Sequence, residues 1–154
     1  ESNLFFSGMR PAVNVGLSVS RVGGAAQTKA MKKAAGSIRI DLAQYREMEV
    51  FTQFSSDLDD DTKEQLQYGK GLMELLKQPL CQPLDMAEQV ITLWTATHKI
   101  FLNVEVKKIK ETQKGMLEYF KNAHPEIIAE LNETKALSDE LGEKILAAAR
   151  EYVK

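Results

Sequence analysis

The sequence predicts an all-α protein: a bundle of about six helices preceded by an extended N-terminal arm. Apolar residues recur every three to four positions along most of the chain, which is typical of amphipathic helices. No strand–helix–strand pattern interrupts them, so a helical bundle is favoured over an α/β fold. Only the segment from Val13 to Ser20 alternates strictly between apolar and small polar or glycine residues, which predicts an extended, half-buried segment.

The helices are predicted from their apolar faces and from the residues that begin and end them. The first runs from about Met31 to Phe54, and Gly36 near its middle marks a bend or a close backbone approach. The second follows the acidic turn at Ser55–Asp61 and ends near Gln78. Later helices are expected to begin at Asp85 with Glu88, near Val104, at Pro125 and at Ser138. Residues expected to face the core include Ile38, Leu42, Tyr45, Leu66, Leu72, Val90, Trp94, Ile109, Phe120, Leu131, Leu141, Ile145 and Tyr152.

Composition allows one folded domain and excludes several classes of protein. The 154 residues are 44% apolar and 27% charged, enough to bury a core. A formal charge of −2 gives no electrostatic reason to expect nucleic acid as a partner. Cys81 is the single cysteine, so no internal disulfide is possible. No apolar run approaches the roughly 20 residues that span a bilayer, so no direct membrane insertion is expected.

Few residues suggest chemistry by their pattern alone. His98 and His124 lack the spacing of metal ligands, and we expect no metal site. The acidic turn lacks the glycine and terminal glutamate of an EF-hand loop, so a helix cap or a protein-contact loop is favoured there. No P-loop (GxxxxGK followed by Ser or Thr) occurs in the sequence. Arg21 remains, at the end of the extended segment, as a residue that could contact a phosphate.

Four segments resemble the alpha-subunit family of rotary F-type ATP synthases. The longest is RPAVNVGLSVSRVGGAAQTKAMKK, from Arg10 to Lys33. The others are LAQYREMEVFTQF (42–54), SDLDDDT (56–62) and GLMELLKQP (71–79). Together they cover about half of the chain in the order and spacing of the family. The segment SVSRVGGAAQT is similar to the alpha-subunit sequence rather than to that of the beta subunit, which shares the fold.

The resemblance implies a role for each matching residue. Arg21 matches the arginine that alpha inserts into the catalytic site of the neighbouring beta subunit, and Val19 and Ser20 match the interface segment that carries it. Arg10, Pro11 and Gln78 match positions beside the adenine in alpha's own non-catalytic site, which is incomplete in this sequence. Asp57, Asp59, Asp60 and Asp61 match the region that faces the central gamma stalk.

The resemblance also implies a domain organisation and a setting. Residues 1–8 are interpreted as a tag remnant, 9–24 as the end of a nucleotide-binding domain, and 25–154 as the C-terminal helical domain. The isolated fragment is then expected to be no enzyme and to bind no cofactor, whereas the full-length subunit would bind Mg-ATP or Mg-ADP. The parent complex would couple proton or sodium transport to ATP synthesis. It would lie peripherally on the cytoplasmic face of a bacterial membrane, or on the equivalent organelle face.

Expected partners are the beta subunits and the gamma stalk, and copies of the fragment could associate through the exposed arm. The alternative is a free-standing helical interaction module whose gene begins near Met9. Two departures from the family remain without a role: Leu80 and Cys81 replace more polar or aromatic residues, and His98–Phe101 replaces a turn that would contain glycine.

Overall fold

The computed structural model describes residues 1–52 and 58–154, and all regular structure in these ranges is helical. Six of the helices there have ten or more residues, as the sequence predicts. The elements are α1 (Ser2–Phe6), α2 (Arg21–Ala26), α3 (Lys29–Ala34), α4 (Ile38–Thr52), α5 (Asp60–Leu75), α6 (Met86–Thr97), the 3-10 helix η1 (Val106–Lys108), α7 (Ile109–Ala123), α8 (Pro125–Thr134) and α9 (Asp139–Val153). The all-α class is confirmed.

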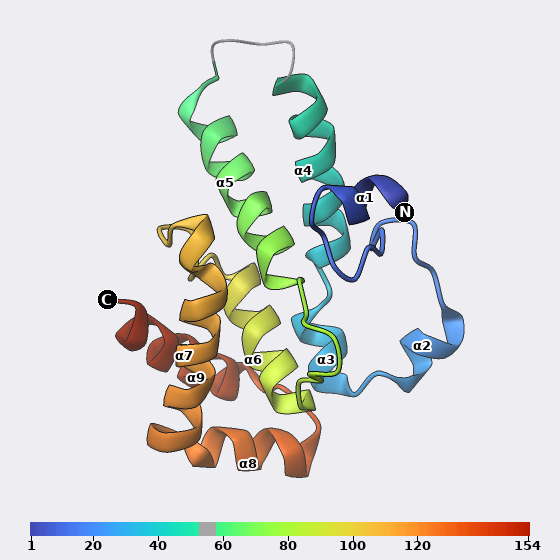
Figure 1. The fold of residues 1–154 in the computed structure, drawn as a ribbon. Helices are drawn as coiled ribbons and strands as arrows, with labels where there is room; N and C mark the ends of the chain where they lie inside the picture. The colour runs from blue at the N-terminus through green and yellow to red at the C-terminus, as the bar shows by residue number, and fades with distance from the viewer. Residues whose placement is uncertain (53–57) are drawn as a thin grey trace.

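Helices α6 and α7 form the centre of the bundle. Helix α6 contacts α3, α5, α7, α8 and α9, and α7 contacts α5, α8 and α9 as well. Helices α4 and α5 form an antiparallel hairpin that projects beyond the other helices, while α1, α2 and the intervening residues lie along one side (Figure 1). The bundle therefore leaves two regions extending from its body: the tip of the hairpin and the N-terminal segment.

The core consists largely of the residues that the helical periodicity predicts. The burial of a large apolar residue stabilises the fold by roughly 1.5–3 kcal/mol. Trp94 is only partly buried against this core, and 37% of Tyr152 remains exposed at the edge of the bundle, where its ring lies 5.5 Å from that of Tyr119. The largest fully buried side chains are Phe120, Leu72, Ile91, Ile109, Met116, Leu131, Leu141, Ile145 and Leu146.

The extended conformation predicted for Val13–Ser20 is wrong over part of that segment. A turn occupies residues 15–17, where the carbonyl oxygen of Asn14 accepts hydrogen bonds from the backbone N–H groups of Leu17 and Ser18. Arg21 begins helix α2 rather than ending an extended segment. A strand needs a partner for its backbone groups, and the described residues contain no other strand. Local hydrogen bonds satisfy part of the segment instead.

The predicted first helix is divided into two. Helix α3 ends at Ala34, a turn covers residues 35–37, and α4 begins at Ile38, so Gly36 does mark a bend. The end of the predicted range, from residue 53, lies outside the described residues. Farther along, α4 and α5 approach each other closely: a Cβ atom on Gly69 would lie only 2.5 Å from Cβ of Tyr45. Glycine is required at this crossing because the tyrosine occupies the space of a side chain.

His98–Phe101 ends helix α6 in a Schellman motif. The backbone N–H of Ile100 donates to the carbonyl oxygen of Thr95, and that of Lys99 donates to Ala96. Lys99 adopts the left-handed conformation (φ 58°) that usually favours glycine. Its ammonium group forms an ion pair of 2.6 Å with Glu64 on α5. A lysine thus occupies the position where the family resemblance leads one to expect glycine, and it also connects α6 to α5.

Candidate functional site

Arg10 and Gln78, two residues that the resemblance places beside an adenine, are in direct contact. The backbone N–H of Gln78 donates a hydrogen bond of 2.9 Å to the carbonyl oxygen of Arg10. The Arg10 guanidinium lies 4.5 Å from the centre of the Phe5 ring, a cation–π distance. The side-chain amide of Gln78 donates to the carbonyl oxygen of Gln82 at 3.0 Å. Pro11, the third such residue, follows Arg10 directly and is exposed.

The end of helix α5 positions Gln78. The last turn closes through hydrogen bonds from the N–H groups of Leu76 to Leu72 and of Lys77 to Glu74. Lys110 on α7 then donates to the carbonyl oxygens of Leu75, at 3.3 Å, and Lys77, at 2.7 Å. A cation at this place is favourable because the final carbonyl groups of a helix carry partial negative charge. Burial lowers the pKa of Lys110, against the opposing attraction of Glu74.

An open groove of about 740 Å³ lies beside Gln78, between the segment that follows α5 and helices α6 and α7. Glu88 lines it and forms an ion pair of 2.6 Å with Lys121, so α6 and α7 are joined across the groove. Glu88 also accepts a hydrogen bond from the backbone N–H of Asp85, which completes the predicted capping box. Although burial opposes ionisation, these hydrogen bonds hold the pKa of Glu88 below its usual value.

Arg21 lies on a short helix that the bundle does not bury. None of the six residues of α2 is buried, and within the described residues no hydrogen bond or ion pair engages the Arg21 side chain. Ser20 caps the helix, since its hydroxyl oxygen accepts a 2.9 Å hydrogen bond from the N–H of Gly23. Val19 and Val22, on either side, are 76% and 82% exposed. The Arg21 side chain is therefore exposed next to the exposed apolar side chains of Val19 and Val22.

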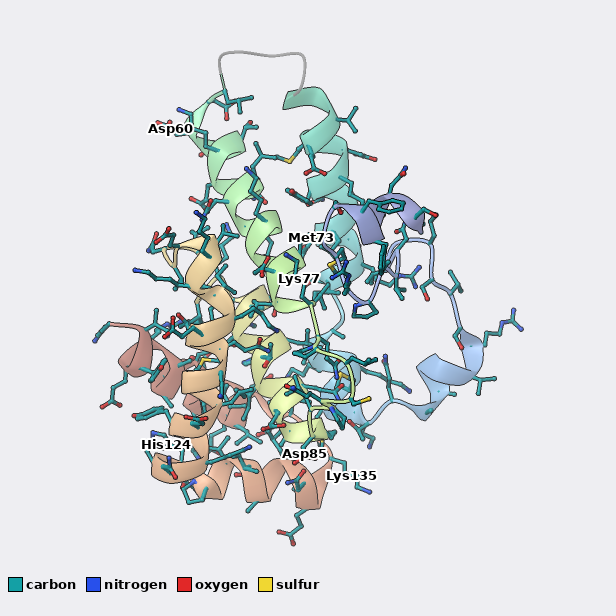
Figure 2. The ribbon with its side chains drawn as sticks, viewed as in Figure 1. Asp60, Met73, Lys77, Asp85, His124 and Lys135 are labelled. Carbon is teal, nitrogen blue, oxygen red and sulfur yellow. The ribbon has the colours of Figure 1, made fainter. Side chains whose placement is uncertain are left out.

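Asp60, in the acidic turn, lies at the opposite end of α5 from Lys77 (Figure 2). Asp59 caps the helix: its carboxylate accepts a 2.7 Å hydrogen bond from the N–H of Thr62, which lowers the pKa of Asp59. Asp60 pairs with Lys63 at 2.9 Å, and Asp61 is exposed. Asp57 lies outside the described residues. In the part of the protein that is described, no three metal-binding side chains gather as ligands.

Sequence reasoning missed Lys110 and its neighbour Gln113. Gln113 is only 4% exposed, and its side chain accepts a 2.6 Å hydrogen bond from Lys110 and donates one of 3.2 Å to Thr92. The available signal was that Lys110 and Gln113 lie three positions apart beside the apolar face of α7, since polar groups that become buried need hydrogen-bond partners.

None of the described helices is both long and apolar enough to cross a membrane.

Comparisons with known proteins identify the family of the chain. A family model described as the C-terminal domain of the ATP synthase alpha/beta chain matches residues 27–152. The protein named ATP synthase subunit alpha from Caldanaerobacter subterraneus subsp. tengcongensis is 49% identical over 152 residues, which is 99% of this chain and 30% of that protein. Its counterpart from Lawsonia intracellularis is 49% identical over all 154 residues, again 30% of the relative.

The chain therefore spans about 30% of the length of these curated relatives. The second alignment includes residues 1–8. These residues also contact the segment that follows them, since the N-terminal ammonium group donates to the carbonyl oxygen of Ala12 at 2.8 Å. The alignment with this relative thus extends through residues 1–8, and their interpretation as a tag remnant stays a prediction.

Proposed function

Because this protein belongs to the family defined by the C-terminal domain of the ATP synthase alpha and beta subunits, we propose that it is the C-terminal region of an ATP synthase alpha subunit. The observation that carries the proposal is the contact between Arg10 and Gln78. Two segments far apart in the sequence meet at the residues that the resemblance places beside a nucleotide. A free-standing interaction module would give no reason for that meeting.

In this proposal, Arg10, Pro11 and Gln78 form the adenine side of alpha's own non-catalytic nucleotide site. The exposed loop after α5 offers amide groups and an apolar proline ring, which suit the edge and the face of a purine. Phosphates and Mg²⁺ would be held by a P-loop, a motif that this sequence does not contain. In this proposal the protein supplies only the adenine side of the site, and the isolated fragment is expected to bind no nucleotide and to be no enzyme.

Arg21 acts in trans on the neighbouring beta subunit. A guanidinium group is always charged, and its planar fork can make two hydrogen bonds to phosphate oxygens, which offsets charge that develops in the transition state. The exposed Leu17, Val19 and Val22 support a protein partner for this segment, because a group of apolar residues is normally covered. The acidic turn would face the gamma stalk. The whole complex would sit peripherally on a membrane and couple proton or sodium transport to ATP synthesis.

Substitution of Arg21 in the full-length subunit, assembled with its partners, tests the proposal. Arg21→Ala should lower ATP turnover by about 10³-fold or more, since arginine fingers typically contribute 10³ to 10⁵ in rate, and should leave assembly intact. Arg150→Ala, an exposed arginine on α9, is the matched control and should retain turnover. Normal turnover in Arg21→Ala would refute the role, and failure of the complex to assemble would assign Arg21 a structural role instead.

A further inference from the structure

One peptide group, the one that joins Lys77 to Gln78, is held from both sides. Its carbonyl oxygen accepts a hydrogen bond of 2.7 Å from the ammonium group of Lys110. Its N–H donates the 2.9 Å hydrogen bond to the carbonyl oxygen of Arg10. The plane of a peptide group is rigid, so two partners on opposite edges define its orientation and with it the start of the Gln78 side chain.

Lys110 is itself anchored in the core of the bundle. Besides Lys77, its ammonium group donates to Gln113 at 2.6 Å and, at 3.3 Å, to the carbonyl oxygen of Leu75. Gln113 continues to Thr92 on α6, which is 3% exposed. An ammonium group has three hydrogens, and here each has an acceptor. The group therefore cannot turn away without leaving a buried acceptor without its partner.

The charge of Lys110 also strengthens the contact on the far side of the peptide group. A cation at a carbonyl oxygen polarises the amide, and a polarised amide is a better hydrogen-bond donor. The bond from Gln78 to Arg10 is therefore reinforced by a residue that contacts neither of their side chains. This connects the packed interface of α6 and α7 to the exposed loop.

We propose that Lys110 is a positioning residue: it orients the Lys77–Gln78 peptide group and so fixes Gln78 and Arg10 as the adenine side of the nucleotide site. The nucleotide part of this statement rests on the proposed function above. The positioning part rests only on the hydrogen bonds of Lys110, Gln113 and Arg10.

Three variants of the full-length alpha subunit test the proposal. Lys110→Met keeps the length of the side chain and removes its donors, while Lys110→Arg keeps a charged donor. Lys114→Met is the matched control, because Lys114 is exposed, lines the same groove one turn later on α7, and makes no ion pair or hydrogen bond with the described residues.

The first measurement is hydrogen exchange of the peptide covering residues 76–82, read by mass spectrometry. In Lys110→Met, its exchange should become at least about tenfold faster, while peptides from α9 keep their rates. Lys110→Arg and Lys114→Met should exchange as the unsubstituted subunit does. Unchanged exchange in Lys110→Met would overturn the proposal, and so would faster exchange throughout the bundle, because Lys110 would then serve general stability.

The second measurement is dissociation of a fluorescent ATP analogue from the isolated full-length alpha subunit. Release should be about tenfold faster in Lys110→Met, corresponding to about 1.4 kcal/mol, and should return close to the original rate in Lys110→Arg. If exchange of residues 76–82 accelerates and release does not, the positioning role stands and the nucleotide role of Gln78 is refuted. The failure of either proposal can thus be recognised separately.

Discussion

A methyl group added at Gly69 tests whether the close approach of α4 and α5 holds their hairpin together. Gly69→Ala places a Cβ atom 2.5 Å from Cβ of Tyr45 and closer still to its ring. These atoms lie at the base of a buried side chain rather than at a flexible end, so α4 and α5 must separate to make room. The hairpin carries Asp59, Asp60 and Asp61 at the start of α5.

The expected loss of stability follows from two opposing terms. Overpacking of a core position typically costs about 1–3 kcal/mol. Replacing glycine by alanine within a helix recovers about 1 kcal/mol. Because the overlap involves both the Cβ and the ring of Tyr45, we expect the larger part of the first range and a net loss of about 1–2 kcal/mol.

Urea unfolding of the protein, followed by circular dichroism, measures this change. Gly71→Ala is the matched control: it lies on the same helix, and its added Cβ would meet Ile109 at an ordinary 3.4 Å. That variant should be as stable as the unsubstituted protein or gain up to about 1 kcal/mol. In a protein that already carries Tyr45→Ala, Gly69→Ala should cost less, because the ring is gone and only the close contact with Cβ of residue 45 remains. The same loss with and without the Tyr45 ring would refute the reasoning.

Two further substitutions test the electrostatics and the capping of the bundle. The folded state holds the pKa of Glu88 below its usual value, so the unfolded state binds the proton first as the pH falls, and the unsubstituted protein loses stability below about pH 4.5. Glu88→Gln removes this carboxylate and should make the free energy of unfolding less dependent on pH in that range. Urea midpoints measured at neutral and acidic pH check this, with Glu111→Gln as an exposed control. If the midpoints of Glu88→Gln and of the unsubstituted protein fall in parallel as the pH is lowered, the prediction is contradicted. Ser138→Ala removes the oxygen that accepts the N–H of Leu141 at the start of α9 and should cost about 1 kcal/mol in thermal or urea unfolding. Ser138→Asn should restore most of that loss, and equal stability of the alanine and asparagine variants would argue against the cap.

The starts of α6, α8 and α9 were predictable because their signals are local, whereas α7 begins at Ile109, after a 3-10 turn, rather than near Val104. Asp85 and Ser138 act on backbone groups two to three residues away, so their capping can be recognised without knowing the fold. Pro125 likewise opens α8 as a first-turn proline. The segment from Val13 to Ser20 was not predictable in the same way, since its alternation describes a strand only when another strand is present to pair with it.

In the candidate site too, features of single segments could be predicted, whereas contacts between distant segments could not. Arg10 and Gln78 could be identified from the resemblance of their segments to a family, but their contact could not, because it joins two backbone groups that carry no sequence signal. Lys110 was missed for a related reason. Its acceptors are carbonyl oxygens at the end of another helix, 33 and 35 positions earlier in the sequence.

Helix α5 connects the two regions to which the proposed function assigns different tasks. It begins directly after the acidic turn at Asp59 and ends just before Gln78, and its 16 residues make a rod of about 24 Å. Backbone hydrogen bonds keep the length of such a rod nearly constant. A displacement of the first residues of α5 along the helix axis would therefore shift the Lys77–Gln78 peptide group by a similar distance. The hydrogen bond from Lys110 to the carbonyl oxygen of Lys77 would oppose this shift. A mechanical event at one end of the bundle thus has a direct path to the segment that lies beside Arg10.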